Sequence, residues 1–408
     1  MRHLLLVLAL TLICAGLPPA RTASAASCAW TGAVSTAWEA VGNWSCGAVP
    51  GPADAVTINS VGATVVLSSA ASVASLTINR GTLSGAGALD VSGLTRIQAF
   101  QDVTISTSGS RLPQLEIAAD SGIVRLTDPA LSADSLQTLV INTTPGGSGS
   151  SVLQVGDHSV GALMLTRGNL SWGGTLSVTG SFSWVAGGLG AASGSSAMLV
   201  IAAGATGTIP TAVGAGQTLG GATLTNNGTL TLTGTPALSL SSGITRARLI
   251  NNGTLEFLTA GPLVLMGSGD VRNNGTLRAG GTLQFDMGVP LVNVGLLDVG
   301  AGRLHAVDLD LQAGELRLAG GSVRSGNNQF AQIRLAGGSI TGSGTITGTI
   351  QNIGGTLAPS GPLRVFGGYT QGPTATLELA LGGLTPGSDF GVLQLTPNQG
   401  VGGGATIN

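Results

Sequence analysis

The sequence predicts an all-β fold, in which short strands wind into a β-solenoid behind a small, disulfide-stapled N-terminal cap. Three observations predict it: a motif that recurs at a spacing typical of solenoids, apolar and polar residues that alternate between its copies, and a Gly-rich composition. Of 408 residues, 68 are Gly and only 8% are charged, about a third of the usual share. Helical repeats are excluded, because strand formers dominate and helix-breaking Gly recurs throughout.

The composition excludes several functions. The chain has no Lys, so Schiff-base, Ser-Lys and P-loop chemistry are excluded. A net charge of −2 offers no basic surface for nucleic acid. Beyond the N-terminal leader only His158 and His305 remain, which is too few for a His-rich metal site. We therefore expect no metal, no cofactor and no nucleic-acid partner.

Residues 1–25 have the pattern of a secretory signal peptide. Arg2 gives a basic start, an apolar run covers 4–17, and small residues at 23–25 offer a cleavage site. The run is shorter than the roughly 20 residues that a membrane-spanning helix needs. We expect a secreted protein, extracellular or on the outer cell surface, with no other transmembrane segment in this chain.

Residues 26–60 form a distinct N-terminal segment, for which we expect a compact cap. Cys28 and Cys46 are the two cysteines left after export, and in an oxidising compartment such a pair forms a disulfide. Three of the five tryptophans lie in the same segment: Trp30, Trp38 and Trp44. Two roles remain open for them, the core of the cap or a platform on which sugar rings stack.

Residues 61–350 carry the solenoid repeats. The motif Asn-Asn-Gly-Thr-Leu starts at Asn226, Asn251 and Asn273, and degenerate copies start at Asn293 and near Asn352. We expect its Leu to point inward, its Thr outward, and its Asn to bond along the stack as a ladder. We expect its Asn-Gly pairs to turn the chain because both residues tolerate positive φ. The structural turn residues are Asn226, Asn227, Gly228, Asn251, Asn252, Gly253, Asn273, Asn274 and Gly275.

Stretches near both ends of the chain resemble a known family, and together the matches cover most of the chain beyond the leader. The Gly- and Thr-rich stretches 337–348 and 352–361, followed by Tyr369-Thr370-Gln371, are similar to passenger regions of bacterial autotransporters and related adhesin-like surface proteins. Trp30-Thr31-Gly32 with Val49-Pro50-Gly51 resembles the opening module of similar secreted proteins. The resemblance implies a right-handed parallel β-helix displayed or released outside the cell, and it supplies no catalytic residue.

The resemblance also implies a membrane barrel at the C-terminal end. Residues 351–408 have the pattern of a passenger-like module, and the chain stops at Asn408 inside a repeat pattern. We expect this sequence to be part of a longer chain; release without an anchor is the alternative.

Few residues qualify for chemistry. No acidic residue lies between Asp157 and Glu256, so this stretch supplies no acid/base pair. Asp308 and Asp310 lie two apart in a strand-like segment with His305 nearby, so they either form a carboxylate or calcium cluster or are simply solvated. Asp157-His158 lacks the nucleophile elbow that a hydrolase triad needs.

We therefore expect an exported, non-enzymatic structural or adhesive protein, a rigid solenoid that acts through multivalent surface contact. Its expected partners are other copies of itself, a host surface or extracellular glycans. Two alternatives remain: a β-helix polysaccharide lyase or hydrolase using Asp308 and Asp310, and a glycan-binding module at the N-terminus.

Overall fold

Alternating apolar and polar residues form short β-strands along the whole described chain, and no α-helix occurs among the described residues. The structure is a computed structural model, in which the expected signal peptide lies outside the described residues apart from Ala25. It describes residues 25–407 except 120–121, 128–135, 144–149, 155, 212–215, 235–236, 242–245, 259–262, 280–283, 327–330, 387–389 and 397–404.

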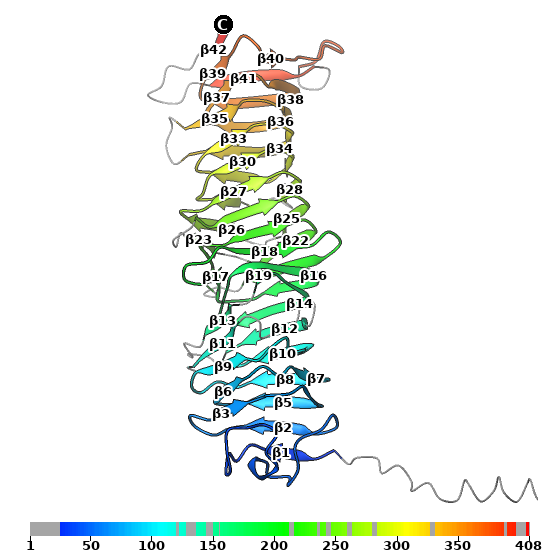
Figure 1. Ribbon diagram of the computed structural model, residues 1–408. Coiled ribbons are helices and arrows are strands. Elements are labelled where there is room, and N and C mark those ends of the chain that lie inside the picture. Colours follow the sequence, from blue (N-terminus) through cyan, green and yellow to red (C-terminus); the bar gives the residue numbers. More distant parts are fainter. Residues whose placement is uncertain are drawn as a thin grey trace, which may run out of the picture.

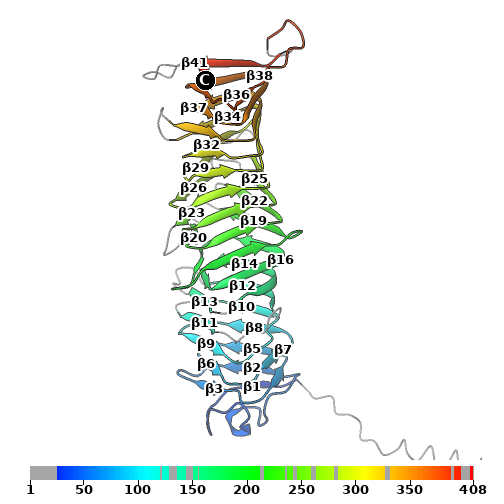
Figure 2. The same ribbon diagram turned by 45° about the horizontal axis from the view of Figure 1, so that its top comes forward.

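The strands stack into one long column, with the N-terminal cap at one end (Figure 1). Each rung passes through three faces, here called A, B and C, and each strand pairs in parallel with the strand one rung later on the same face. Turning the molecule shows the same elongated stack from a second side (Figure 2). The predicted parallel β-solenoid is confirmed.

The strands of each face are as follows. Face A contains β1 (Ser27–Ala29), β2 (Ala55–Ile58), β5 (Ser75–Ile78), β8 (Leu94–Ile97), β10 (Gln114–Ile117), β12 (Leu136–Asn142), β14 (His158–Arg167), β16 (Gly174–Trp184), β19 (Thr206–Thr211), β22 (Thr229–Gly234), β25 (Thr254–Leu258), β28 (Thr276–Ala279), β31 (Leu296–Gly300), β34 (Glu315–Ser325), β36 (Ser339–Thr347), β38 (Thr356–Phe366) and β40 (Thr376–Leu377). Face B contains β3 (Thr64–Val66), β6 (Gly81–Ser84), β9 (Val103–Ser106), β11 (Ile123–Thr127), β13 (Ser150–Gln154), β15 (Asn169–Trp172), β17 (Gly188–Ala191), β20 (Gln217–Gly220), β23 (Ala237–Ser241), β26 (Leu263–Gly267), β29 (Gln284–Met287), β32 (Arg303–Ala306), the second halves of β34, β36 and β38, and β41 (Val392–Thr396). Face C contains β4 (Ala71–Val73), β7 (Leu89–Val91), the first parts of β12, β14 and β16, and β18 (Ala197–Ile201), β21 (Thr223–Asn226), β24 (Arg248–Asn251), β27 (Asp270–Asn273), β30 (Leu291–Asn293), β33 (Leu309–Leu311), β35 (Gln332–Leu335), β37 (Thr349–Asn352), β39 (Tyr369–Gln371) and β42 (Ala405–Ile407).

The rungs differ in length although their strands stay in register. Thr229 pairs with Thr254 of the next rung, whereas Ser339 pairs with Thr356, so the later rung is much the shorter. Six long strands, β12, β14, β16, β34, β36 and β38, run around a corner and carry a register shift there or nearby. The turns between strands therefore absorb the variation in rung length.

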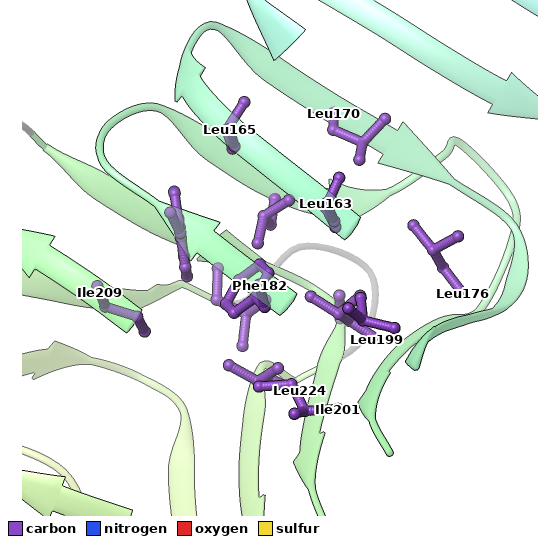
Figure 3. Close-up of a cluster of buried hydrophobic side chains, with 14 of the residues drawn as sticks. Leu163, Leu165, Leu170, Leu176, Phe182, Leu199, Ile201, Ile209 and Leu224 are labelled. Atoms are coloured by element: carbon purple, nitrogen blue, oxygen red, sulfur yellow. The ribbon is translucent and has the colours of Figure 1, made fainter. Parts of the chain in front are cut away.

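The core is one continuous column of inward-pointing, mostly aliphatic side chains that come from all three faces. In β22, Leu230 and Leu232 are fully buried, while Thr229 faces solvent. Leucine and isoleucine from successive rungs pack around Phe182 in the middle of the stack (Figure 3). The predicted inward Leu and outward Thr are confirmed, because a strand with period two places alternate side chains on opposite sides.

Strand pairing continues through both ends of the expected solenoid region. At the N-terminal end β1 pairs with β2 of the first rung, which ties the cap segment to the stack. At the other end β39 and β42 continue face C beyond residue 350. Residues 351–407 thus add further rungs to the same stack, as far as the structure describes them.

Candidate functional site

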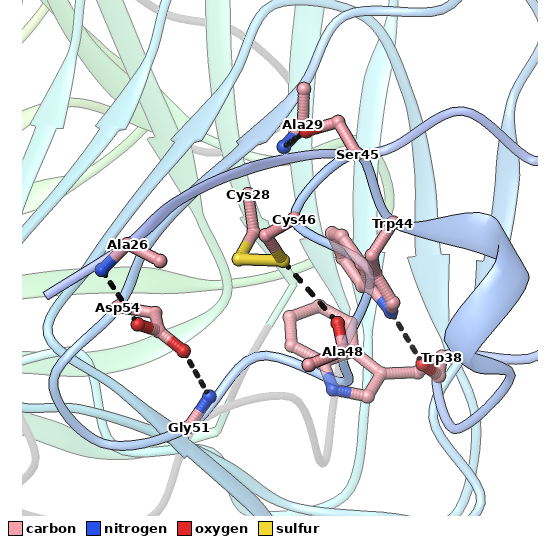
Figure 4. The surroundings of a disulfide bond; sticks show 10 residues. All are labelled: Ala26, Cys28, Ala29, Trp38, Trp44, Ser45, Cys46, Ala48, Gly51 and Asp54. Atoms are coloured by element: carbon pink, nitrogen blue, oxygen red, sulfur yellow. Dashed lines mark hydrogen bonds between the residues drawn. A yellow bond between two sulfur atoms is a disulfide. The ribbon is translucent and has the colours of Figure 1, made fainter. Parts of the chain in front are cut away.

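The predicted disulfide joins Cys28 of β1 to Cys46. It closes a loop of 18 residues that includes the short 3-10 turn η1 (Val41–Asn43). The loop folds back over the first rung, and Ser45 accepts a hydrogen bond from the amide of Ala29 at 2.8 Å (Figure 4). The N-terminal cap is therefore stapled as predicted.

The three cap tryptophans are buried. Their exposed fractions are 6% for Trp30, 0% for Trp38 and 3% for Trp44. Trp44 packs edge-on against both others, with ring centroids 5.0 and 4.7 Å apart, and its indole N–H donates to the carbonyl of Trp38 at 2.7 Å. Sugar stacking requires an exposed ring face. The structure therefore favours the core role over the glycan-stacking role.

Two carboxylates that sequence inspection missed fasten the cap. Asp54 accepts hydrogen bonds from the amides of Ala26 and Gly51, both at 2.8 Å (Figure 4). Glu39 accepts from the amides of Ser68 and Ser69 at 2.8 and 2.9 Å. Burial alone would raise the pKa of Glu39, but the backbone amides that donate to it lower this pKa below its ordinary value. Asp54 thus holds Ala26 at the start of the cap, and Glu39 fastens the cap loop to the residues that follow β3.

The first Asn of each motif forms a buried ladder along face C. The Asn226 amide donates to Asn251 Oδ1 at 2.8 Å, Asn251 donates to Asn273 at 2.7 Å, and Asn273 donates to Asn293 at 2.7 Å. All four are fully buried. The predicted ladder is confirmed, and Asn352 stands outside it because Leu311 and Leu335 occupy the two intervening rungs.

The second Asn of each motif forms an exposed ladder with the opposite direction. The Asn252 amide donates back to Asn227 Oδ1, and the Asn274 amide donates back to Asn252 Oδ1, both at 2.8 Å. The side chain of Arg272 donates to Asn274 at 2.9 Å. The motif therefore places one row of side-chain amides inside the rod and a second row on its surface.

The motif glycines correct one of our predictions. Gly228, Gly253 and Gly275 do not have the positive φ that we expected of a turn glycine. A Cβ at Gly253 would instead overlap the carbonyl oxygen of Gly228, and one at Gly275 would overlap that of Gly253. The motif requires Gly because neighbouring rungs approach too closely for any side chain.

Asp308 and Asp310 lie at β33 on face C, but the structure does not bring them together with His305. Asp310 accepts hydrogen bonds from Arg334 and Gln312, both at 2.9 Å, while Asp308 is exposed. His305 belongs to face B, where Asp286 and the carbonyl of Gly326 flank its ring at 2.8 and 3.0 Å. Across the described ranges no three His, Cys, Asp or Glu side chains form a metal-binding group.

Face A carries a ladder of alternating charge. Arg278 lies 3.0 Å from Glu256 and 3.7 Å from Asp298, and Arg317 bonds Asp298 from the next rung. The Arg317 hydrogen bond lowers the pKa of Asp298 below its ordinary value, although partial burial opposes it, and Arg278 adds to the effect. The same bond raises the pKa of Arg317. The ladder neutralises this face.

Between these charged rungs and the N-terminal half lies an uncharged band. No Asp, Glu, Lys, Arg or His occurs between Arg167 and Arg246. The band includes the strands from β15 to β23, whose outward side chains are chiefly Thr, Ser and Gly. Its surface offers hydroxyl groups, amides and exposed backbone, with no ionisable group for acid/base catalysis.

The N-terminal part of the chain is similar to a known family of undefined role. A domain of unknown function (DUF8693) matches residues 29–134, which cover most of the cap and the first rungs of the stack. No curated protein and no solved structure matches the chain. In the part of the chain that the structure describes, no helix is long and apolar enough to cross a membrane.

Proposed function

We propose that this chain is an exported, non-enzymatic rod, and that it works by surface contact repeated over many rungs. The observation that carries the proposal is the uncharged band between Arg167 and Arg246 on a continuous parallel stack. On a rigid array, one weak contact holds the partner surface close to the next group and so raises its effective concentration. Many hydroxyl and amide groups together therefore bind a partner surface tightly.

An extracellular setting, secreted or on the outer cell surface, fits the same features. A disulfide in the cap is typical of oxidising compartments, and the leader-like residues 1–25 would bring the chain there. The passenger-like pattern of residues 337–361 supports a role similar to that of bacterial surface adhesins. We propose other copies of the rod, a host surface or extracellular glycans as its contact partners.

Low surface charge is what favours association between rods, because no like-charge repulsion keeps uncharged bands apart. The test is sedimentation velocity of the purified mature protein, combined with its adhesion to cells, matrix and immobilised glycans. The double variant Thr208→Arg/Thr218→Arg places two cations in the band, where Thr208 has only the uncharged partners Ser183 and Thr231 on the neighbouring rungs. We expect it to associate and adhere less than the wild type.

The matched control adds the same charge outside the band, at the outward positions Thr57 and Thr370 near the two ends of the rod. Thr57→Arg/Thr370→Arg should behave as the wild type does. A wild-type protein that neither associates nor adheres would overturn the proposal, and so would equal losses in both double variants.

A further inference from the structure

Three arginines on face B, Arg303, Arg324 and Arg364, lack the acidic partner that most arginines in this rod possess, and among the described residues Arg364 donates only to Gln394, at 3.4 Å. Arg96, Arg125 and Arg334 each contact a carboxylate at 2.7 to 2.9 Å, and that carboxylate lies one rung away. Arg303 and Arg324 are exposed and make no ion pair or hydrogen bond with any residue that the structure describes. They are therefore free to bind an external anion.

The two free guanidinium groups border one hollow. Arg303 of β32 pairs with Ser322, and its neighbour His305 pairs with Arg324 in the second half of β34, so the arginines stand diagonally on consecutive rungs. The hollow has a volume of about 290 Å³, and Thr347 from the following rung also lines it. Cationic and hydroxyl groups thus converge on one open site.

The same face continues this pattern along the rod. Arg303, Ser322, Thr345 and Arg364 occupy equivalent positions on four successive rungs. At about 4.8 Å per rung, Arg303 and Arg364 lie roughly 14 Å apart. We call Arg303, Arg324 and Arg364 the B-face arginine stripe; hydroxyl side chains lie between its members.

The stripe is locally cationic in a chain whose net charge is −2. Asp286 is the only acidic residue in the described B-face strands from β29 to β41, and His305 occupies one of its oxygens at 2.8 Å. A planar guanidinium donates paired hydrogen bonds to carboxylates and sulfates. A ligand with acidic groups spaced along a chain would meet successive arginines, and its hydroxyl groups would meet Ser322, Thr345 and Thr347.

We infer that the B-face arginine stripe binds an acidic polysaccharide through its carboxylate or sulfate groups. A polymer fits better than a single small anion because the stripe extends over four rungs and remains open. Nucleic acid fits less well, since three arginines on an acidic protein give little electrostatic attraction. The inference adds a ligand class to the proposed rod and rests on that proposal only for the extracellular setting.

Isothermal titration of the whole mature protein tests the inference with three probes: dextran sulfate, polygalacturonate and uncharged dextran. We expect binding to a charged probe and none to dextran; the tighter of the two charged probes identifies sulfate or carboxylate as the preferred group. Arg303→Ser/Arg324→Ser should weaken binding at least tenfold, about 1.4 kcal/mol. Since neither side chain has a partner among the described residues, the unfolding midpoint of this variant should match that of the wild type.

Arg167→Ser is the matched control, because Arg167 is an exposed arginine outside the stripe. This variant should bind as the wild type does. The inference fails if the wild type binds neither charged probe, if Arg167→Ser loses as much affinity as the double variant, or if duplex DNA binds equally well through the same arginines. If the wild type binds a charged polysaccharide but neither associates nor adheres, the proposed function fails and this inference stands.

Discussion

Gly253 has no Cβ, and this absence lets its rung stack closely on the rung that contains Gly228. Gly253→Ala would force the new methyl group against the carbonyl of Gly228, so the rungs would have to separate locally. Overpacking of this kind typically costs about 1–3 kcal/mol. We expect that loss in the free energy of unfolding from urea titration. The control is Gly156→Ala at an exposed position where a Cβ meets nothing, which should change stability by less than about 0.5 kcal/mol.

Asn251 links four groups inside the rod. It accepts from Asn226 and donates to Asn273, and its amide also lies 2.9 Å from the carbonyl of Thr276 and 3.2 Å from the carbonyl of Gly253. Asn251→Ala leaves buried polar groups without partners, at about 1–3 kcal/mol each, so we expect a total loss of about 2–5 kcal/mol in urea unfolding. Asn252→Ala breaks only the exposed ladder and should cost less than about 1 kcal/mol; equal losses would contradict the distinction between the two ladders.

The residue scale also shows what could be predicted from sequence. The buried ladder followed from Asn residues that recur at the rung period, and the faces of β22 followed from alternation of Leu and Thr. The glycine requirement did not follow, because a close approach between rungs is a property of packing that no local pattern records. The tryptophans were predicted as core or platform, and only their burial distinguishes the two.

Among the elements, the cap depends on a covalent link that the rest of the rod lacks. Closing a loop of 18 residues stabilises a fold by about 3 kcal/mol in the chain-entropy model. Cys28→Ser/Cys46→Ser should therefore unfold the cap at a lower denaturant concentration than the rungs. Tryptophan fluorescence reports largely on the cap, which contains three of the five tryptophans. In this variant the fluorescence transition should occur at a lower denaturant concentration than the loss of the β-strand circular dichroism signal. Coincident transitions would show that cap and rungs unfold together and would contradict the prediction.

The charge ladder on face A predicts how stability depends on pH. Because the pKa of Asp298 is lower in the folded protein than in the unfolded chain, its contribution is fully present above the ordinary pKa of 3.8. That contribution is lost as the pH falls from there through the lower folded value. Asp298→Asn should remove this part of the acid sensitivity. Unfolding midpoints measured from pH 6 to pH 2 check it, and parallel curves for the two proteins would contradict it.

The sequence could not predict which charged residues pair between rungs. Glu256 meets Arg278 after 22 residues, but Asp298 meets Arg317 after 19. Because the rung length changes, the partner of a given charge depends on the size of every turn between them. The same variation hid the alignment of Arg303 with Arg364. A corner between β32 and β33 places His305 and Asp310 on different faces.

At the scale of the whole molecule, the stack predicts an elongated particle. Figures 1 and 2 show a column much longer than it is wide. Small-angle scattering of the purified protein should give an asymmetric pair-distance distribution with a long tail, and far-ultraviolet circular dichroism should show strands. A symmetric distribution, or a helical spectrum, would contradict the solenoid.

The long rung that begins at Thr229 and the short rung that begins at Ser339 share one continuous core. Length and register are therefore decoupled: a turn can lengthen while the strands on either side keep their partners. Such a scaffold can acquire or lose surface loops during evolution without a new core having to form. Engineered peptides could be grafted at those corners for the same reason, each held at a known height along the axis.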